Sequence, residues 1–447
     1  MALEFAGKFR VRRGVAGITA VAVLSGLTLA ACGSSGSTSA GNTTTTAGSS
    51  TPSSQSSSGN TASAPGITPT SITVGQIADI SEPVPGLFKS AQVGVQAYFA
   101  YINSLGGVNG RKLIIDSRDS AFNPGKITSD AQDIAKNEFA FVGNYTLFDI
   151  GMKPAIDSGH VPNISVAIGN DLGNDPNTYS PTPSTGNDYA LGPYEWLKQH
   201  NADATQHVGI LYAAATASTK QAFTVQSQAL DHLGYKIVYA RGFSQNETTF
   251  TSDVLAMKAK GVKIFMGVAF PDNYAATISR EFSEQNFHPL NWETAGYGSQ
   301  FLPLAGGTAE GAYLPLGTAL FLGEDAKAIP AVGTFTKWMK QIDSKDSIAL
   351  WGATAWSAAA LFVQALKNAG KNPTRASLVA ALNNITNFDA GGLIAPSNPA
   401  QNIPAHCWLL AQVKSNKIVR VSPSPSSGFI CSPGDMLPIN GWTPEKR

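Results

Sequence analysis

The 447-residue sequence has few charged residues, few cysteines and none of the common hydrolase motifs. Asp, Glu, Lys and Arg make up only 14% of the chain, and its three cysteines are Cys32, Cys407 and Cys431. It contains neither a Gly-x-Ser-x-Gly nucleophile motif nor a His-Glu-x-x-His zinc motif, and its six histidines are scattered. We therefore expect a protein that is not an enzyme and that carries no metal and no cofactor.

The charge balance argues against a nucleic-acid partner. Removal of residues 1–31 takes away four basic residues and Glu4, which leaves 27 Lys and Arg against 29 Asp and Glu. The remaining net charge is −2 and no basic run survives, so neither a nucleic acid nor a polybasic membrane surface is indicated. No second long apolar segment follows residue 31, which predicts that the rest of the chain does not span a membrane.

The N-terminus has the pattern of an exported lipoprotein. Lys8 and three arginines precede an uncharged apolar segment, Gly14 to Ala31, which ends in Leu29-Ala30-Ala31-Cys32. Small residues before a cysteine mark a signal-peptide cleavage site. This ending resembles a bacterial lipobox, in which Cys32 receives lipid and becomes the mature N-terminus. We expect a lipoprotein signal peptide over 1–31 and a lipid-anchored, extracytoplasmic protein. An ordinary signal peptide, an N-terminal anchor and a twin-arginine signal at Arg12-Arg13 remain open.

A long segment without charge follows the cysteine. Residues 33–64 carry no aliphatic side chain larger than alanine, so they cannot bury enough apolar surface to offset the entropy of ordering. We expect residues 32–66 to form a disordered Ser/Thr/Gly tether. A flexible coil of this length spans roughly 30 Å on average, enough to hold a domain away from a bilayer.

The remaining residues alternate short β-rich runs with amphipathic helices, which favours two α/β lobes because ~380 residues exceed one comfortable core. Expected strands lie at 71–75, 112–117, 139–143, 164–166, 207–212, 236–240 and 262–267. Expected helices lie at 88–105, 124–138, 219–233, 249–260, 272–285, 348–369 and 374–382. Two such series in tandem imply parallel sheets with right-handed crossovers, and Cys407–Val413 with Lys417–Val421 predict a C-terminal hairpin.

Two cysteines remain if Cys32 carries lipid. In an exported, oxidising setting a Cys407–Cys431 disulfide is expected, with a stabilisation of about 3–4 kcal/mol on the chain-entropy model. Two free buried thiols remain the alternative.

One string is diagnostic of a family. Asn103-Ser104-Leu105-Gly106-Gly107-Val108-Asn109-Gly110-Arg111-Lys112-Leu113 resembles the first helix–strand junction of the type I periplasmic solute-binding proteins, in the branched-chain amino-acid (Leu/Ile/Val-type) ABC transporter family. Further matches follow in order over roughly 71–425: Ile72-Thr73-Val74-Gly75, Phe141-Val142-Gly143, Leu233-Gly234-Tyr235-Lys236-Ile237-Val238, Thr249-Phe250-Thr251-Ser252-Asp253-Val254, Gly311 and Trp356-Ser357-Ala358-Ala359.

The resemblance implies two doubly wound parallel-sheet lobes joined by a three-crossover hinge that closes on a solute. Lobe I would comprise 71–184 plus 300–391, and lobe II 185–299 plus 392–447. The implied partners are a small-molecule solute and the permease and ATPase subunits of an ABC transporter, with the binding protein itself a monomer. A ligand-sensing lipoprotein that acts through a receptor is the alternative function.

In lobe I the resemblance points to the turns that follow the strands. Tyr145 and Thr146 follow the third strand, where amino-acid binders place a hydroxyl for the ligand carboxylate. After the fourth strand the family's threonine is absent, and Gly169 or Asn170 must supply any donor. Phe88, near the loop after the first strand, is a further candidate contact. Helix capping by Thr146, packing of Tyr145 between the lobes, and a place for Phe88 in the first turn of a core helix remain the alternatives.

In lobe II the candidate contacts are Phe270, Asp272 and Tyr297. Phe270-Pro271-Asp272 resembles the family's aromatic-aromatic-Pro-acid string, with Ala269 in place of one aromatic residue. The turn that carries the glutamate for the ligand's ammonium group reads Ala295-Gly296-Tyr297-Gly298 and has no acid. Aromatic packing between lobes and an N-cap role for Asp272 remain open.

The missing acid bears on the ligand. A desolvated ammonium group without a charged acceptor costs several kcal/mol. Unless Asp272 substitutes, a simple branched-chain amino acid should bind poorly. The predicted ligand is a neutral or anionic organic solute with an aromatic or hydrophobic part.

Overall fold

A computed structural model describes residues 59–81, 87–183, 188–244, 246–345, 348–423, 428–431 and 436–438, with the side chain of Asn170 excepted. The predicted signal peptide, Cys32 and most of the predicted tether lie outside these residues. Within the described ranges, no helix combines the length and the apolar character needed to cross a bilayer.

The sheet of lobe I is parallel, with the strand order β2–β1–β3–β4. Its strands are β1 (Ser71–Ala78), β2 (Lys112–Asp119), β3 (Phe141–Val142) and β4 (Asn163–Ile164). The order reverses direction between β1 and β3, so the carboxyl ends of these two strands flank a crevice.

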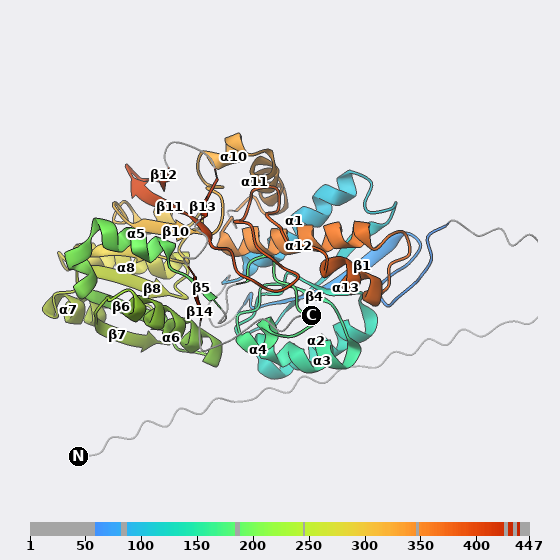
Figure 1. Cartoon of the computed structure of the whole chain (residues 1–447), viewed down its shortest axis with the longest axis horizontal. Helices are drawn as coiled ribbons and strands as arrows, with labels where there is room; N and C mark the ends of the chain where they lie inside the picture. Colours follow the sequence, from blue (N-terminus) through green and yellow to red (C-terminus); the bar gives the residue numbers. More distant parts are fainter. Residues whose placement is uncertain are drawn as a thin grey trace, which may run out of the picture. The chain divides into compact units, whose positions relative to one another are not determined.

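Helices cover both faces of this sheet. They are α1 (Lys89–Ser104), α2 (Pro124–Asn137), η1 (Asp149–Met152), α3 (Lys153–Gly159), α4 (Asn170–Gly173), α10 (Asp325–Ala328), α11 (Pro330–Ile342), α12 (Leu350–Asn368) and α13 (Arg375–Leu382). In Figure 1, α1 and α12 lie side by side. A side chain at Gly94 of α1 would stand 2.4 Å from the carbonyl oxygen of Gly352 of α12, so only glycine permits this approach.

The sheet of lobe II is larger and mixed, with the order β12–β11–β10–β9–β8–β6–β7. Its strands are β6 (Val208–Ala213), β7 (Ile237–Phe243), β8 (Ile264–Val268), β9 (Leu290–Glu293), β10 (Tyr313–Leu316), β11 (Cys407–Lys414) and β12 (Lys417–Ser422). The pairs from β7 to β10 are parallel, whereas β10–β11 and β11–β12 are antiparallel. Here the order reverses between β6 and β8, which gives lobe II a crevice of its own.

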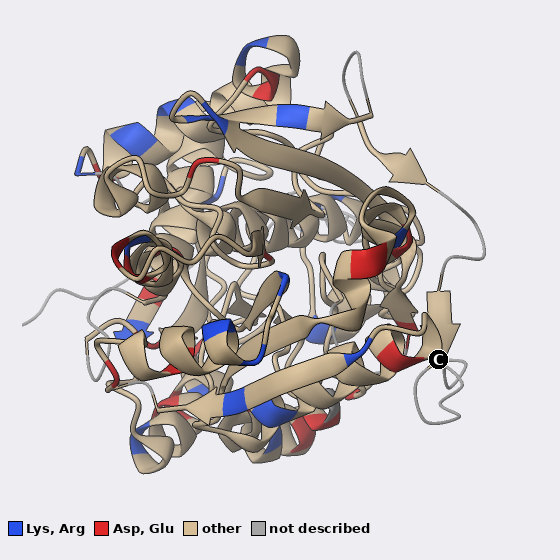
Figure 2. Cartoon of the chain, turned by 90° about the vertical axis from the view of Figure 1, so that its left-hand side faces the viewer, with Lys and Arg blue, Asp and Glu red and all other residues tan. Residues whose placement is uncertain are grey.

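The remaining elements belong to lobe II or its edge. They are β5 (Asp188–Ala190), α5 (Gly192–His200), η2 (Ala202–Gln206), α6 (Ala217–His232), α7 (Thr251–Ala259), α8 (Asp272–Glu284), α9 (Phe301–Ala305), β13 (Ile430–Cys431) and β14 (Met436–Pro438). The predicted α/β fold with doubly wound parallel sheets is confirmed. The positions of Lys and Arg alternate with those of Asp and Glu along the ribbon in Figure 2, which agrees with the balanced charge of the sequence.

The lobe boundaries differ from the prediction in two segments. Residues 300–316, assigned above to lobe I, belong to lobe II, because β10 pairs with β9 and β11. Residues 392–403, assigned to lobe II, pack on lobe I. There Ile394 bridges to Thr318, and the Asn402 side chain donates to the carbonyls of Gly173 and Thr178. We therefore assign to lobe I the described residues of 59–183 and 318–403, and to lobe II the described residues of 188–317 and 404–438.

The end of the predicted tether is docked on lobe I, which corrects the expectation of disorder up to residue 66. The N–H of Thr61 donates to Asn372 Oδ1 at 2.9 Å, and Ser63 Oγ donates to the carbonyl of Pro373 at 2.6 Å. Arg111 also donates to the carbonyl of Thr61 at 2.9 Å. These polar contacts order a segment that has no large apolar side chain, a mechanism that composition alone does not reveal.

The predicted hairpin and disulfide are both present. Strands β11 and β12 pair in antiparallel register from Val413↔Ile418 to Lys414↔Lys417 at the turn. Cys407 is bonded to Cys431 and lies opposite it in the β11–β13 pair. The bridge fastens the C-terminal segment to the sheet of lobe II.

Candidate functional site

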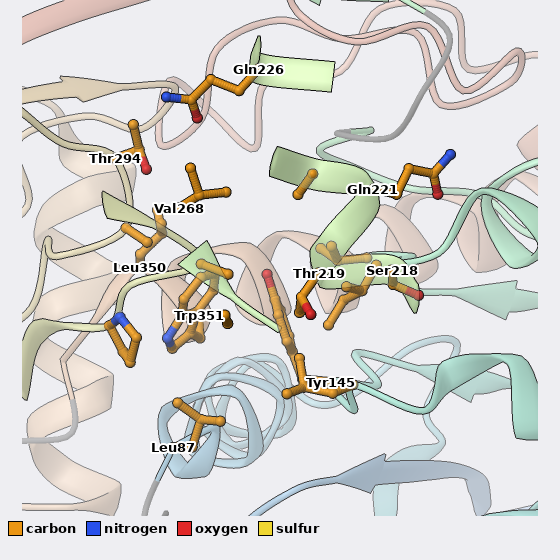
Figure 3. Close-up of a pocket in the computed structure, with 18 of the residues that line it drawn as sticks. Leu87, Tyr145, Ser218, Thr219, Gln221, Gln226, Val268, Thr294, Leu350 and Trp351 are labelled. Carbon is orange, nitrogen blue, oxygen red and sulfur yellow. The ribbon is translucent and has the colours of Figure 1, made fainter. Parts of the chain in front are cut away.

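A cavity of about 300 Å³ lies between the lobes, at the carboxyl ends of the parallel strands of both sheets (Figure 3). Its walls come from the segments that follow β1, β3 and β4 in lobe I and β6, β8 and β9 in lobe II, with the start of α12. Its lining residues are Leu87, Phe88, Tyr145, Leu147, Val166, Ile168, Tyr189, Ala213, Ser218, Thr219, Gln221, Ala222, Val225, Gln226, Phe243, Val268, Ala269, Pro271, Tyr274, Thr294, Ala295, Leu350 and Trp351. Ligands of doubly wound folds bind at this edge of the sheet.

Three aromatic rings form the wall of lobe I. The ring centroid of Tyr145 lies 4.8 Å from that of Phe88 and 5.2 Å from that of Trp351, and Phe88 meets Trp351 edge-on at 5.5 Å. The Tyr145 hydroxyl accepts a weak hydrogen bond from Thr354 Oγ1 at 3.4 Å. Burial raises the pKa of Tyr145 well above its usual value, so its hydroxyl is neutral. This wall offers flat apolar surface and one phenolic oxygen.

Helix α6 supplies most of the polar groups of the lobe II wall. A capping box between Thr216 and Thr219 fixes its first turn. Ser218, Gln221 and Gln226 of this helix line the cavity. The side chains of Ser218 and Gln221 make no hydrogen bond with any described residue, and so they can bind a polar group of a ligand.

Charged side chains are absent from this lining within the described part of the chain. The same ranges contain no cluster of three or more His, Cys, Asp and Glu side chains that could hold a metal ion. A cavity with apolar walls and neutral polar groups binds molecules through burial of hydrocarbon and a few directional hydrogen bonds.

Two buried carboxylates of lobe I lie just behind the lining. Asp79 Oδ2 accepts from the N–H of Leu147 at 2.8 Å. Asp149 Oδ2 accepts from the N–H groups of Ile168 at 2.7 Å and Gly169 at 2.9 Å. Burial raises the pKa of both acids, that of Asp149 to about 6, although the N–H donors oppose the shift. Both carboxylates thus bind backbone donors at the ends of β3 and β4.

The structure brings two of the predicted lobe I residues, Phe88 and Tyr145, to the cavity. Their contact with a ligand stays a prediction. Thr146 does not line the cavity; it is buried, and its hydroxyl accepts from the N–H of Phe148 at 3.2 Å. It does not cap η1, whose N-cap is Phe148 without a side-chain cap bond. Asn170 begins α4, and its side chain lies outside the described residues.

None of the three predicted lobe II residues lines the cavity. Phe270 is fully buried behind it, with its ring 5.4 Å from those of Phe243 and Phe250. Asp272 is the first residue of α8, and burial raises the pKa of its carboxyl. The Tyr297 hydroxyl accepts from the N–H of Leu322 at 2.9 Å, and its ring packs on Phe321. All three serve packing or helix-end roles in this structure.

Backbone direction explains the displacement of Phe270. Ala269 has a positive φ of 52°, a left-handed conformation that is rare outside glycine. The turn places Ala269 and Pro271 in the cavity wall and directs Phe270 into the aromatic core.

Several lining residues were missed by the sequence reasoning. Trp351 and Leu350 come from the start of α12, and Tyr189 lies on the short strand β5. Ser218 belongs to the uncharged segment Ala213–Ser218, which was not among the predicted contacts. Its direct position after β6 was the signal that could have identified Ser218.

A second cavity adjoins the first. It measures about 360 Å³ and shares Tyr145, Tyr189 and Trp351 with it as a common wall. It extends along the interlobe crossovers as far as Cys407 and Trp408.

Comparison with known proteins places these features in context. A family model described as "Periplasmic binding protein" matches residues 71–417, well over half of the chain. A sequence comparison with curated proteins finds no match.

Among solved structures, a fatty acid ABC transporter substrate-binding protein from Thermomonospora curvata has a TM-score of 0.68 at 20% identity, covering 83% of this chain and 95% of its own. A branched-chain amino acid ABC transporter protein from Thermus thermophilus with bound valine has a TM-score of 0.69 at 16% identity, covering 81% and 97%. A possible leucine/isoleucine/valine-binding protein from Rhodopirellula baltica SH 1 has a TM-score of 0.67 at 15% identity, covering 79% and 96%. These likenesses show the fold.

Proposed function

Since this chain belongs to the periplasmic binding protein family, a class that binds small solutes and works with ABC transporter permeases, we propose that it captures an organic solute with a large apolar part and delivers it to such a permease. The observation that carries the proposal is the interlobe cavity with aromatic and aliphatic walls and no charged side chain among the described lining residues. Burial of hydrocarbon at about 25 cal/mol per Å² is the main source of affinity in such a site.

The cavity is poorly suited to a free amino acid. A zwitterion needs a partner for its ammonium group and donors for its carboxylate, and it loses several kcal/mol if either charge is desolvated without them. Asp272, the one acid among the predicted lobe II contacts, does not line the cavity. The Thermus thermophilus protein holds valine on the same fold, so the difference lies in the side chains and not in the architecture.

The arrangement of the walls supports capture by closure. The aromatic wall of Phe88, Tyr145 and Trp351 belongs to lobe I, and the α6 wall belongs to lobe II. A ligand that contacts both walls stabilises the closed arrangement of the lobes, because only that arrangement provides both sets of contacts. A permease can then distinguish loaded from empty protein by the separation of the lobes. An elongated solute can extend past Tyr145 into the adjoining cavity.

We place the protein outside the cytoplasm, anchored by lipid on Cys32. The apolar segment with its Leu29-Ala30-Ala31-Cys32 ending supports this, together with the uncharged segment that follows. The contacts of Thr61 and Ser63 fix the end of the predicted tether on lobe I. In a homologous bacterial host, Cys32→Ser should release the protein from the membrane fraction and abolish incorporation of labelled palmitate. Membrane retention of this variant would instead support an uncleaved anchor.

Two measurements test the binding and transport proposal. The protein is purified without refolding, its bound small molecules are extracted and analysed by mass spectrometry, and a Trp351→Ala sample serves as the matched control. Enrichment of an apolar compound in the wild type alone supports the proposal. Uptake of that compound, labelled, should fall when the gene is deleted. Unchanged uptake with a lost transcriptional response would identify a sensor, and a co-purified free amino acid would contradict the apolar class.

A further inference from the structure

On the lobe I side of the cavity, three backbone donors at the turns where a ligand carboxylate would bind are already hydrogen-bonded to buried acids. Backbone N–H groups beyond the carboxyl ends of parallel strands are the usual anion-binding groups of doubly wound folds. In this chain the N–H of Leu147, beyond β3, binds Asp79, while those of Ile168 and Gly169, beyond β4, bind Asp149. Leu147 and Ile168 themselves line the cavity, so these donors stand at its edge and are already occupied.

Asp149 is built into this position. Its side chain is 2% exposed, and its Oδ2 accepts both N–H groups in the manner of a bound carboxylate. Its other oxygen, Oδ1, has no hydrogen-bond partner among the described residues. A buried carboxylate oxygen without a partner is costly, and a structural role in η1 alone does not require it.

The free oxygen of Asp149 and the hydroxyl of Ser218, which belongs to the opposite lobe, both lie beside Gly169. A Cβ atom placed on Gly169 would lie 3.2 Å from Asp149 Oδ1 and 2.9 Å from Ser218 Oγ, so both side chains abut the same point from the two lobes. No side chain fits between them. Ser218 and Gln221 lie in the first turns of α6, the other place where a helix end could receive an anion (Figure 3). The negative charge of Asp149 lies near the N-terminal end of α6 and would repel an anion bound there.

The inference from these contacts and from the uncharged lining rests on the solute-binding role proposed above. It narrows the class of ligand that the site accepts. We infer that Asp149, supported by Asp79, is a specificity-determining residue that occupies the carboxylate position of lobe I and restricts the site to uncharged ligands. The ligand is an apolar molecule with a neutral polar end, such as a hydroxyl, ketone, ester or amide, that binds Ser218 or Gln221. An apolar carboxylate of the same length is rejected, because the N–H groups of Leu147, Ile168 and Gly169 are already bonded and the carboxylate meets the charge of Asp149.

The test uses matched pairs of probes that differ only in charge. Decanol is compared with decanoate, and phenylbutanol with phenylbutyrate, by isothermal titration or thermal shift on the delipidated protein at pH 8, where Asp149 is ionised. We expect each alcohol to bind at least about tenfold more tightly than its acid. Equal or tighter binding of the acids would overturn the inference while leaving the apolar-solute function intact. Binding of neither series would contradict that function itself.

Two substitutions then assign the selectivity to Asp149. Asp149→Ala frees the N–H groups of Ile168 and Gly169, so decanoate should gain affinity and the preference for the alcohol should fall to about threefold or less. Asp149→Asn keeps an acceptor for these donors but removes the charge, and an intermediate preference is expected. The control is Asp171→Ala, which removes an exposed acid of α4 near Asp149 without touching either donor.

Folding is checked by circular dichroism, and affinities are compared only between folded proteins. If Asp149→Ala does not fold, Asp149→Asn carries the test. Unchanged preference in a folded Asp149 variant, or the same loss of preference in Asp171→Ala, would remove Asp149 as the determinant.

Discussion

The ring of Tyr145 lies 5.2 Å from the ring of Trp351, centroid to centroid, although one follows β3 and the other begins α12. Phe88 completes the cluster through contacts with both rings. The second segment of lobe I, which the chain reaches only after most of lobe II, thus supplies part of the wall that the first segment begins. The site exists only once both segments of lobe I have assembled.

Trp351→Ala should lower the affinity for the neutral probe decanol by about tenfold or more. A large aromatic side chain in the centre of a binding site contributes several times more than a peripheral contact. Titration calorimetry measures the effect. Trp338→Ala is the matched control, since Trp338 also belongs to lobe I and packs beside Tyr101, away from the cavity. Equal losses in the two variants would mean that general destabilisation, and not ligand contact, explains the result.

Glu293→Gln should change the pH dependence of stability. Glu293 ends β9, is fully buried and has no hydrogen-bond partner for either carboxyl oxygen among the described residues. Burial raises its pKa to about 8, so the folded protein holds a proton that the unfolded chain releases near pH 4.5. Between these values Glu293 lowers the free energy of unfolding by about 1.4 kcal/mol for each unit of rising pH.

The glutamine variant lacks this term and keeps the shape of the side chain. In urea unfolding at pH 5, 6.5 and 8, its stability should gain on that of the wild type as the pH rises, and the difference should level off above about pH 8.5. If the free energies of unfolding of the two proteins change in parallel with pH, the pKa of Glu293 is not raised. Water would then reach its carboxyl group, directly or through local opening of the fold.

The fold could be predicted from sequence because its signals are local. Helix α2 was expected at 124–138 and spans Pro124–Asn137, since Asn123 caps it and Pro124 occupies its first turn. Strand β10 was not predicted, because Tyr313-Leu314-Pro315-Leu316 is short and contains a proline. Pairing with β11, almost a hundred residues further along the chain, makes it a strand. The predicted lobe boundary was therefore wrong at residues 300–316, where strand pairing distant in sequence determines the lobe.

A lining residue was predictable only where it directly follows a strand and no non-glycine residue between them has a positive φ angle. Tyr145 satisfies this condition. Phe270 does not, because the left-handed Ala269 reverses the side that each residue faces. The roles of Asp79 and Asp149 depend on hydrogen bonds to turns some 68 and 20 residues away, for which the sequence has no periodic signal.

Arg111→Lys should release the segment that leads into lobe I. The Arg111 guanidinium is buried and donates to the carbonyls of Thr61, Thr68 and Lys371 and to Asn372 Oδ1. An ammonium group cannot satisfy this planar set of acceptors, so we expect faster amide exchange and proteolysis of residues 59–68. A stability loss of about 1–3 kcal/mol should accompany it. Lys112→Ala, at the exposed neighbouring position, is the control. Unchanged exchange in Arg111→Lys would mean that Asn372 and Pro373 hold the segment alone.

Phe270→Ala should act on stability first. The ring has no exposed surface, and its centroid lies 5.4 to 5.9 Å from those of Phe243, Phe250, Tyr274 and Phe265. Removal of a buried phenylalanine costs about 3–5 kcal/mol, and the cavity left behind determines where in this range the cost falls. Denaturant unfolding gives this loss, and titration of folded protein with decanol gives the affinity.

Phe270→Leu separates packing from ligand contact, because it keeps most of the buried volume and removes the ring. We expect it to recover most of the lost stability and to bind decanol within about threefold of the wild type, since Phe270 lies behind Ala269 and Pro271 and not in the cavity wall. A fall in affinity with an unchanged melting temperature in both variants would show that the ring turns toward the ligand when the lobes move, and it would restore Phe270 to the binding site.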